Sequence, residues 1–502
     1  MMRRVPGPTD HVVVVGGGLS GLSAALHLAG RGRQVTVLER YGFPGGRMGR
    51  ADISGYRIDT GPTVLTMPEL LDEAFAAVGA QLASHLDLVP LDPAYRATFA
   101  DGSHCTVHRD ADQMASVIAQ FADSDQAAGY LRLRQWLTEL YRLEMDGFIS
   151  ANFDSPVSLL TPQLAKLAMI GGFRGWEGMV RRFISDERLM RLFTFQALYA
   201  GVPPRQALAA YAVIAYMDTV AGVYFPRGGM RAVPEAMAAA AAAAGVEFRY
   251  CTTVTALERK GNRISAVLTE AGDRIHCDVV VLTTELPLTY QLLGRSPKRI
   301  WARKPAPSAF VMHVGVRSVG SALEHHNISF GDAWSQTFEE IIDDGVLMSD
   351  PSLLITMPTA SDPSLAPTGR DLLYLLAPCP NLAGGKVDWN AIRDDYAAKV
   401  LGTAAQRLLP GLDDDAQILD IVAPNDWADQ GMAAGSPFAL AHTFAQTGPF
   451  RPANLLRGID NAVLAGGSTV PGVGIPTTVV SGRLAADRIT GTSISPARRV
   501  LM

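Results

Sequence analysis

Three glycines near the start of the chain have the spacing that lets a backbone loop hold a diphosphate. Gly16, Gly18 and Gly21 form a Gly-x-Gly-x-x-Gly pattern between an apolar run and a stretch of small and apolar residues. In that context the first glycine allows a tight turn, the second lets N–H groups approach a pyrophosphate, and the third lets a helix pack closely on a strand. The helix N-terminus at Leu19 and Ser20 would face the anion with its partial positive charge. The pattern predicts a dinucleotide site.

An acidic residue completes this pattern. Glu39 follows Gly21 by eighteen residues and stands at the end of the second expected strand, where a carboxylate can accept hydrogen bonds from ribose hydroxyls. The same carboxylate would repel a 2′-phosphate, which argues against NADP. Arg40, the next residue, is expected to contribute to the same site. The alternative is that the glycines only shape a turn and that Glu39 is a solvated acid.

The following stretch resembles the extended dinucleotide-binding motif of the amine-oxidase and phytoene-desaturase flavoproteins. Gly45-Gly46-Arg47 follows the acid, and a Gly-x-x-x-Asp-x-Gly pattern then runs from Gly55 to Gly61. The resemblance implies FAD, whose ribitol and isoalloxazine need contacts beyond the pyrophosphate. These contacts are expected at Gly46, Arg47, Gly61, Pro62 and Thr63. Arg47 would place a cation near phosphate or flavin, or would form a structural ion pair. Asp59 is interpreted as a structural acid of the loop.

Two later segments are similar to other parts of the same superfamily. Phe225–Met230 resembles its Pro-x-Gly-Gly element, and Val254 stands where members place a valine against the adenine, although an ordinary strand valine is the alternative. Ala465–Pro476 resembles the C-terminal flavin motif of bacterial carotenoid desaturases. The resemblance implies a helix that begins at Ile475 and stabilises the anionic reduced flavin. The implied flavin contacts are Gly466, Gly467, Gly474, Ile475 and Pro476.

Three inner stretches are similar to the CrtI-type phytoene desaturases, the carotenoid desaturases of bacteria and fungi. They are Ser185–Phe195, Leu323–Phe330 and Asp362–Pro367, and the resemblance extends from Val12 to about Ile489. It implies an FAD-dependent oxidoreductase that acts on CH–CH groups of phytoene or a similar acyclic carotenoid. Hydride would pass to flavin N5 and a proton to a base or water, extending conjugation toward lycopene-type products. A quinone or oxygen would reoxidise the flavin.

Departures from that family keep other functions open. Val470 stands where the family commonly has a histidine, and Gly467-Ser468 replaces its more usual Ala-Gly pair. One alternative is therefore a carotenoid isomerase, saturase or terminal oxidase. Another is a non-enzymatic polyene carrier that holds FAD as a structural ligand. The motif lacks the acidic residue of many amine oxidases, which argues against amine oxidation. No catalytic base is predicted, since His325 and His326 on a strand would point to opposite faces and are more typical of structural or surface histidines.

The elements that must position these residues predict an α/β protein. Strands are expected at 12–15, 35–38, 246–248, 254–258, 264–268, 279–282 and 462–465, and helices at 19–31, 235–244 and 475–489. A Rossmann-like FAD-binding domain would be assembled from three segments, residues 1–70, 225–300 and 455–502. Residues 71–224 would form a mostly helical substrate and membrane-facing region, and residues 301–454 a mixed α+β substrate domain.

Composition sets the remaining limits. The 502 residues are 48% hydrophobic and 19% charged, with a formal net charge of −5 and no basic block, which argues against nucleic-acid binding. The four cysteines are scattered, so neither a disulfide framework nor a metal site is expected, and a reducing cytoplasm is the default. Nothing in the sequence determines the oligomeric state.

A lipophilic polyene substrate would require a route to the bilayer. No run of about 18 apolar residues predicts a transmembrane helix, but Ser158–Phe173 is a candidate helix lying on the membrane surface, which would make the protein a peripheral, monotopic one. One face of that helix would hold Leu160, Leu164, Leu167 and Ala168. A core helix is the alternative. Either a tunnel or a core would explain the nearby aromatic residues Trp176, Phe183, Phe193, Phe195 and Tyr199.

Overall fold

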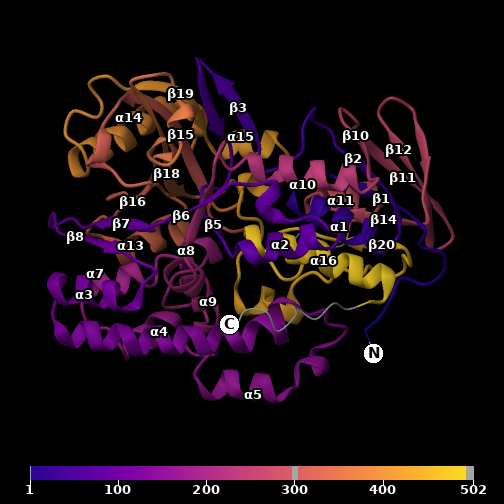
Figure 1. Ribbon diagram of the computed structural model, residues 1–502, viewed down its shortest axis with the longest axis horizontal. Coiled ribbons are helices and arrows are strands. Elements are labelled where there is room, and N and C mark those ends of the chain that lie inside the picture. Colours follow the sequence, from indigo (N-terminus) through magenta and orange to yellow (C-terminus); the bar gives the residue numbers. More distant parts are fainter. Residues whose placement is uncertain (1, 297–302, 493–502) are drawn as a thin grey trace.

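A parallel five-stranded sheet forms one half of the molecule. The computed structural model describes residues 2–296 and 303–492 (Figure 1). The sheet order is β10-β2-β1-β14-β20, and every neighbouring pair is parallel. Its strands are β1 His11–Val15, β2 Gln34–Leu38, β10 Glu247–Arg249, β14 Val279–Leu282 and β20 Ala462–Leu464. The expected strands are confirmed to within a residue or two, as apolar runs predict for a parallel sheet buried on both faces.

Helices cover one face of this sheet and a small antiparallel sheet covers the other. The helices are α1 Leu19–Ala29, α2 Pro68–Ala76, α10 Ala232–Ala243 and α16 Ile475–Thr490, and they lie together in Figure 1. The small sheet comprises β11 Val254–Lys260, β12 Arg263–Thr269 and β13 Arg274–His276. Val12 packs in the same cluster as Leu22 of α1, whereas its neighbour Val13 packs with Val267 of β12. Successive side chains of β1 thus anchor opposite layers.

A seven-stranded mixed sheet forms the other half. Its order is β19-β15-β18-β17-β16-β7-β8, with only β16 and β7 parallel among its described pairs. The strands are β7 Tyr95–Thr98, β8 His104–Val107, β15 Ser308–Arg317, β16 His326–Ser329, β17 Leu353–Thr356, β18 Arg370–Cys379 and β19 Gln417–Val422. Helix α14, Trp389–Arg407, packs with β15 and β18 in a second hydrophobic core.

The expectation of a mostly helical segment from about residue 66 to 224 is wrong in part. Strands β6 (Leu88–Leu91), β7 and β8 lie within it, and β7 pairs with β16, which is more than 200 residues away in the sequence. The rest is helical: α3 Ala111–Phe121, α4 Ser124–Glu144, α5 Pro162–Met169, α6 Trp176–Val180, α7 Glu187–Leu192, α8 Ala197–Ala200 and α9 Val213–Tyr216. Two π-helical turns, η2 Met145–Ile149 and η5 Met217–Ala221, continue α4 and α9.

Short elements complete the chain. They are β3 Arg50–Ile53, β4 Tyr56–Asp59, β5 Leu65–Thr66, β9 Val223–Pro226, α11 Leu286–Leu292, α13 Trp334–Phe338, η7 Glu339–Asp344 and α15 Pro424–Asp429. The boundary expected between residues 300 and 301, and the end of the last segment at 493–502, lie outside the described residues. Helix α10 begins at Ala232, two residues before Pro234, because proline is accepted anywhere in the first turn of a helix.

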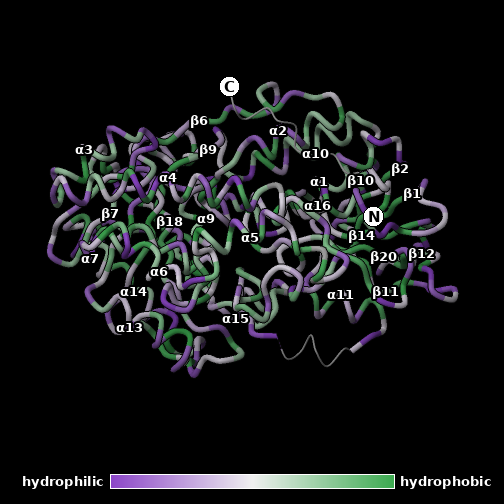
Figure 2. The backbone as a smooth tube through the Cα atoms, turned by 90° about the horizontal axis from the view of Figure 1, so that it is seen from below, coloured by the Kyte–Doolittle hydropathy of each residue, from purple (hydrophilic) through white to green (hydrophobic). Residues whose placement is uncertain are grey.

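The candidate membrane helix is shorter than predicted. Helix α5 spans only Pro162–Met169, and the Thr161 hydroxyl caps it by accepting from the N–H of Leu164 at 3.2 Å. Leu160 therefore lies before the helix, with 76% of its surface exposed, while Leu167 is buried. The predicted apolar face is wrong for Leu160, because the chain reaches that residue in a 3₁₀ turn and not at a helical angle, whereas Leu164, Leu167 and Ala168 do lie in α5. Figure 1 shows α5 at the lower edge of the molecule, below α4, and Figure 2 shows it from below near the middle of that face.

Candidate functional site

One cavity of about 910 Å³ collects the predicted site residues from all three sequence segments. Its lining includes Gly16, Gly18, Leu19, Ser20, Glu39, Arg40, Gly46, Arg47, Gly61, Pro62, Thr63, Val254, Gly466, Gly467, Gly474, Ile475 and Pro476. Gly21 is the predicted residue that does not line it. A Cβ at Gly21 would lie 2.1 Å from the carbonyl oxygen of Gly16, so this glycine serves the close packing of α1 on β1. The glycine loops at the two ends of the chain thus face the same space.

The first glycine loop is held by the acid that follows it. The Glu39 carboxylate accepts from the N–H of Gly17 at 2.6 Å and from the N–H of Tyr41 at 2.9 Å. Glu39 is buried, so the alternative of a solvated acid is wrong. Leu22 donates the first bond within α1, to Gly18, so the N–H groups of Leu19, Ser20 and Gly21 precede the helical ladder. Such a helix start fits a diphosphate.

Arg47 forms a structural ion pair at the cavity wall. Its guanidinium contacts Glu285, whose other carboxylate oxygen accepts from the Ser468 hydroxyl at 2.9 Å. Arg47 and Glu285 both line the cavity. The three residues come from the three segments of the sheet, and the sequence analysis missed Glu285. Its signal was its place just after β14, since ligands of parallel sheets bind beyond the carboxyl ends of the strands.

Asp59 joins the first segment to the Pro-x-Gly-Gly element. Its carboxylate accepts from the N–H groups of Met230 at 2.8 Å and Arg231 at 3.0 Å. Gly229 has φ +90°, and a Cβ there would meet the same carboxylate at 2.8 Å. Burial raises the pKa of Asp59 to about 6, against the effect of these hydrogen bonds. The structural role expected for Asp59 is confirmed.

The C-terminal glycine loop is fastened by a buried arginine. Arg451 donates from Nε to the carbonyl of Thr469 at 3.0 Å and from Nη2 to the carbonyl of Gly467 at 2.6 Å. Gly466 and Gly474 have φ of +122° and +123°, which L-residues with side chains rarely adopt. Helix α16 begins at Ile475, as predicted. The loop therefore presents its backbone and the α16 N-terminus to the cavity.

His442 is a second residue that the sequence analysis missed. It is buried at the cavity wall beside this loop, and a Cβ at Gly472 would lie 2.8 Å from its Nε2. Burial and the Arg451 charge hold its pKa well below the ordinary value, so the ring is neutral. Val470, where the resemblance would place a histidine, lines the same cavity. No spacing in the sequence connects His442 with the loop, because tertiary packing alone brings them together.

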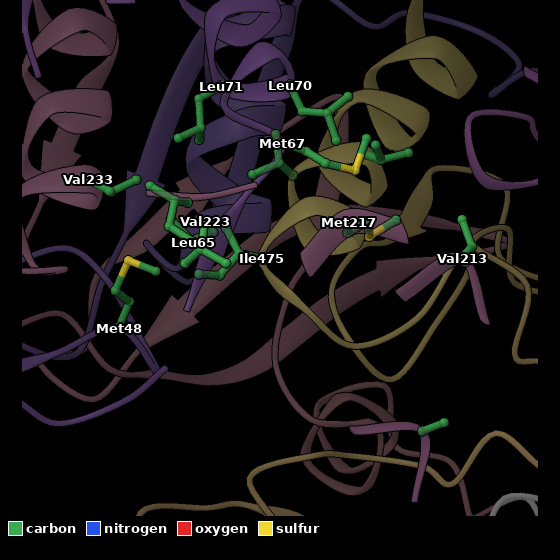
Figure 3. Close-up of a cluster of buried hydrophobic side chains, with 14 of the residues drawn as sticks. Met48, Leu65, Met67, Leu70, Leu71, Val213, Met217, Val223, Val233 and Ile475 are labelled. Carbon is green, nitrogen blue, oxygen red and sulfur yellow. The ribbon is translucent and has the colours of Figure 1, made fainter. Parts of the chain in front are cut away.

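The remainder of the cavity is an apolar chamber between the helical region and the seven-stranded sheet. Its walls include Phe195, Leu198, Tyr199, Tyr211, Ile214, Phe330, Trp334, Tyr374, Leu376 and Phe438. Of the aromatic residues expected there, Phe195 and Tyr199 line the chamber, whereas Trp176 and Phe193 are fully buried in the core. Two buried carboxyl side chains, Glu144 and Asp218, also face the chamber. Figure 3 shows the apolar packing beside it, where Ile475 of α16 lies near Leu65 and Val223, and Met217 of η5 belongs to the same cluster.

The two adjacent histidines are not part of this chamber. Strand β16 begins at His326, so His325 precedes it, and the two rings pack against each other with centroids 4.5 Å apart. His325 pairs with the Ser361 hydroxyl at 2.7 Å and His326 with the Thr356 hydroxyl at 2.9 Å. Both rings are buried. The expectation of opposite faces is therefore wrong, and so is the surface interpretation, whereas the structural one fits.

Exposed apolar side chains surround one end of the chamber. Val157, Leu160, Met169 and Phe173 are exposed by 71%, 76%, 78% and 45%, and Phe444 and Phe450 by 63% and 46%. Neighbours of these residues, including Leu159, Leu164 and Pro449, line the cavity, as does Phe173 itself. Across residues 2–296 and 303–492, no helix combines the length and apolarity needed to cross a bilayer. Within the same residues, no His, Cys, Asp and Glu cluster could hold a metal ion, and all four cysteines are free.

Comparison with known proteins gives the family. The model of the flavin-containing amine oxidoreductases matches residues 19–490. A phytoene dehydrogenase from Streptomyces griseus is 57% identical over 99% of this chain and 98% of its own, and a zeta-carotene-forming phytoene desaturase from Myxococcus xanthus is 34% identical over 97% and 96%. A structure of putrescine oxidase bound to putrescine has the same fold, with a TM-score of 0.60 at 16% identity over 96% of this chain and 99% of that one. The chain therefore belongs to the family of flavin-containing amine oxidoreductases, and its cofactor is FAD.

Proposed function

We propose that this chain is an FAD-dependent desaturase of phytoene or a similar acyclic carotenoid. The observation that carries the proposal is the continuity of the glycine-loop site with an apolar chamber. Phytoene-type hydrocarbons offer no groups for ionic recognition, so their affinity must come from apolar burial, at roughly 25 cal/mol per Å². The 57% identity to a phytoene dehydrogenase over nearly the full length supports the same substrate class.

The residues divide the work between cofactor and substrate. FAD, when bound, supplies the acceptor for two electrons, which no side chain can provide. The loops at Gly16–Gly21 and Gly466–Ile475 would hold its diphosphate and its ring system, with Glu39 at the ribose. The chamber walls orient the polyene and exclude water, which favours one geometry at the reacting carbons. We further propose the three sheet segments as the FAD-binding domain and residues 71–224 as the substrate and membrane-facing region.

The exposed apolar residues around α5 support a peripheral membrane position. A carotenoid dissolved in a bilayer could enter the chamber between Phe173 and Pro449 without crossing water. Exposed apolar side chains grouped at one cavity mouth are typical of a lipid-contacting surface. The protein would then lie on the cytoplasmic face of a membrane, and a quinone in the bilayer or dissolved oxygen would reoxidise the flavin.

Product analysis tests the proposed reaction. Holoprotein is incubated with phytoene in liposomes, with a quinone or air as acceptor, and the pigments are separated by chromatography. The proposal predicts stepwise products with longer conjugation and visible absorbance. Rearranged double bonds without net oxidation would support an isomerase, loss of double bonds a saturase, and oxygen in the product a terminal oxidase. Flavin reduction by putrescine and not by phytoene would indicate an amine oxidase.

A further inference from the structure

A buried carboxyl group stands in the wall of the apolar chamber. Asp218, the second residue of η5, lines the cavity and is only 3% exposed. Its Oδ2 makes no short hydrogen bond among the described residues, although the side chains of Gln196 and Tyr95 lie close enough to interact with the carboxylate. Leaving a polar atom unpaired in an apolar wall is costly, so such an atom is expected to have a function. The π-helical turn that holds Asp218 is of a kind found frequently at functional sites.

The turn that holds this carboxyl group is connected through β5 to α16, at the expected flavin site. Element η5 packs against β5 and β9, the two strands that pair beside α16. Met217, the residue before Asp218, lines the same cavity as Ile475 at the start of α16, and both belong to one hydrophobic cluster (Figure 3). The α16 N-terminus belongs to the C-terminal glycine loop. Asp218 is therefore a buried residue of the cavity wall on an element that β5 connects to α16, and not one of the exposed residues around α5.

We propose that the Asp218 carboxylate is the proton acceptor of the dehydrogenation, which rests on the proposed desaturase function. The CH₂–CH₂ pair of the substrate would lose one hydrogen with its electron pair as hydride, for which FAD, when bound, would supply the two-electron acceptor. The neighbouring carbon loses a proton to Asp218, and the electron pair left by that C–H bond forms the new double bond. Asp218 then releases its proton to water before the next turnover. The substrate is oxidised by two electrons, and the flavin is reduced by two.

The electrostatics of the chamber distinguish Asp218 from its neighbours. Burial raises the pKa of Asp218 to about 7, while Gln196 and Tyr95 lower it by smaller effects, so the group can both accept and release a proton near neutral pH. Burial holds the pKa of Glu144 well above its usual range, which disfavours the charged carboxylate that a base needs. His442 is a weak candidate for the proton acceptor, because burial and the Arg451 charge beside it disfavour the protonated ring that would form. Asp218 is the cavity carboxyl group best matched to this role.

The pH dependence of the rate tests the role. The titratable side chains facing Asp218 are those of Tyr95 and Tyr199, whose pKa values burial raises well above 10, so neither ionises near neutral pH. With phytoene, the rate of flavin reduction in the wild type is expected to rise with pH to a plateau above about 7. Asp218→Asn is expected to lose at least about 100-fold in that rate and to lose the acid limb, as for removal of a general base. Asp218→Glu is expected to regain part of the rate and the limb.

Two further measurements keep the test decisive. Glu144→Gln is expected to keep the acid limb, because the limb is assigned to Asp218 and burial disfavours the charged form of Glu144. Infrared titration of the substrate-free holoprotein is expected to show a carboxyl band that disappears through about pH 7 and is missing in Asp218→Asn. The melting temperature and flavin content of Asp218→Asn report whether it has folded.

The outcomes separate this inference from the proposed function. If wild-type protein does not reduce its flavin with phytoene at any pH, the desaturase function itself is wrong. If the wild type does so but a folded, flavin-loaded Asp218→Asn keeps the rate and the acid limb, only the assignment of Asp218 is overturned. A rate loss in Asp218→Asn with the acid limb intact also overturns it, because that pattern indicates a structural role.

Discussion

Single residues hold the cofactor site together through contacts that cross the chain. Glu39 fixes the first glycine loop, Arg451 fixes the last, and Glu285 connects Arg47 to Ser468. The sequence predicted the glycines and Glu39, because their motif is local. Arg451, His442 and Asp218 could not be predicted as site residues, since tertiary packing alone brings them to the cavity, whereas Glu285 could have been found from its place just after β14.

Gly18 offers a test of the nucleotide loop. Its backbone has φ −73° and ψ 176°, which valine adopts without strain. Gly18→Val is nevertheless expected to abolish flavin retention, because the side chain would occupy the space through which the diphosphate approaches the N–H groups. Absorbance of the purified protein measures this. Gly402→Val, at a helix position with open space around it, is the matched control and should stay yellow. A yellow Gly18→Val would count against the assignment of this loop.

Arg451 offers a test of the C-terminal loop. Lysine keeps the charge but cannot reproduce the two bonds to Thr469 and Gly467. Arg451→Lys is expected to lower the free energy of unfolding by about 2–3 kcal/mol, the scale of a lost charge-assisted hydrogen bond, and to weaken FAD binding. Urea unfolding with and without added FAD measures both effects. Arg317→Lys, at a side chain that is 80% exposed, should change neither, and equal behaviour of the two variants would contradict the role.

At the scale of elements, local patterns predicted the parallel sheet well and failed where partners are distant. Strands β1 and β14 are built on continuous runs of valine, β2 has Val35, Val37 and Leu38, and each strand was predicted from its own residues. Strands β7 and β8 were not, because β7 depends on β16 for its pairing. The range of α5 was overestimated, since the apolar residues before Thr161 continue the pattern of the helix without its geometry.

The region around α5 makes a prediction about membrane binding. Leu160 and Met169 are among its most exposed apolar side chains, so polar replacements should leave the fold intact. The double variant Leu160→Asp with Met169→Asp is expected to reduce partitioning onto liposomes by at least about tenfold. A tenfold change corresponds to about 1.4 kcal/mol of binding free energy. That is less than the burial of two such side chains in the bilayer contributes. Co-sedimentation measures it.

The control for that experiment lies elsewhere on the molecule. Ile418 of β19 is 45% exposed on the seven-stranded sheet, away from α5 (Figure 1). Ile418→Asp should leave co-sedimentation unchanged. Equal binding of the double variant and the wild type would remove α5 from the membrane-contacting surface.

At the scale of the whole molecule, two sheets and a helical region enclose one continuous space. The first and last glycine loops are separated by more than 440 residues, yet they face the same cavity, which continues into the apolar chamber. The fold alone does not select a reaction, because a putrescine oxidase shares it at 16% identity. The apolar chamber and its exposed rim are what favour a hydrocarbon substrate from the bilayer.

Anaerobic mixing of the yellow holoprotein with phytoene tests the central claim most directly, because a single turnover needs no external acceptor. The flavin absorbance should bleach while absorbance of a longer conjugated polyene appears, one molecule of FAD reduced for each new double bond. A flavin that stays oxidised while phytoene is bound would contradict the claim that cofactor and polyene meet in this cavity.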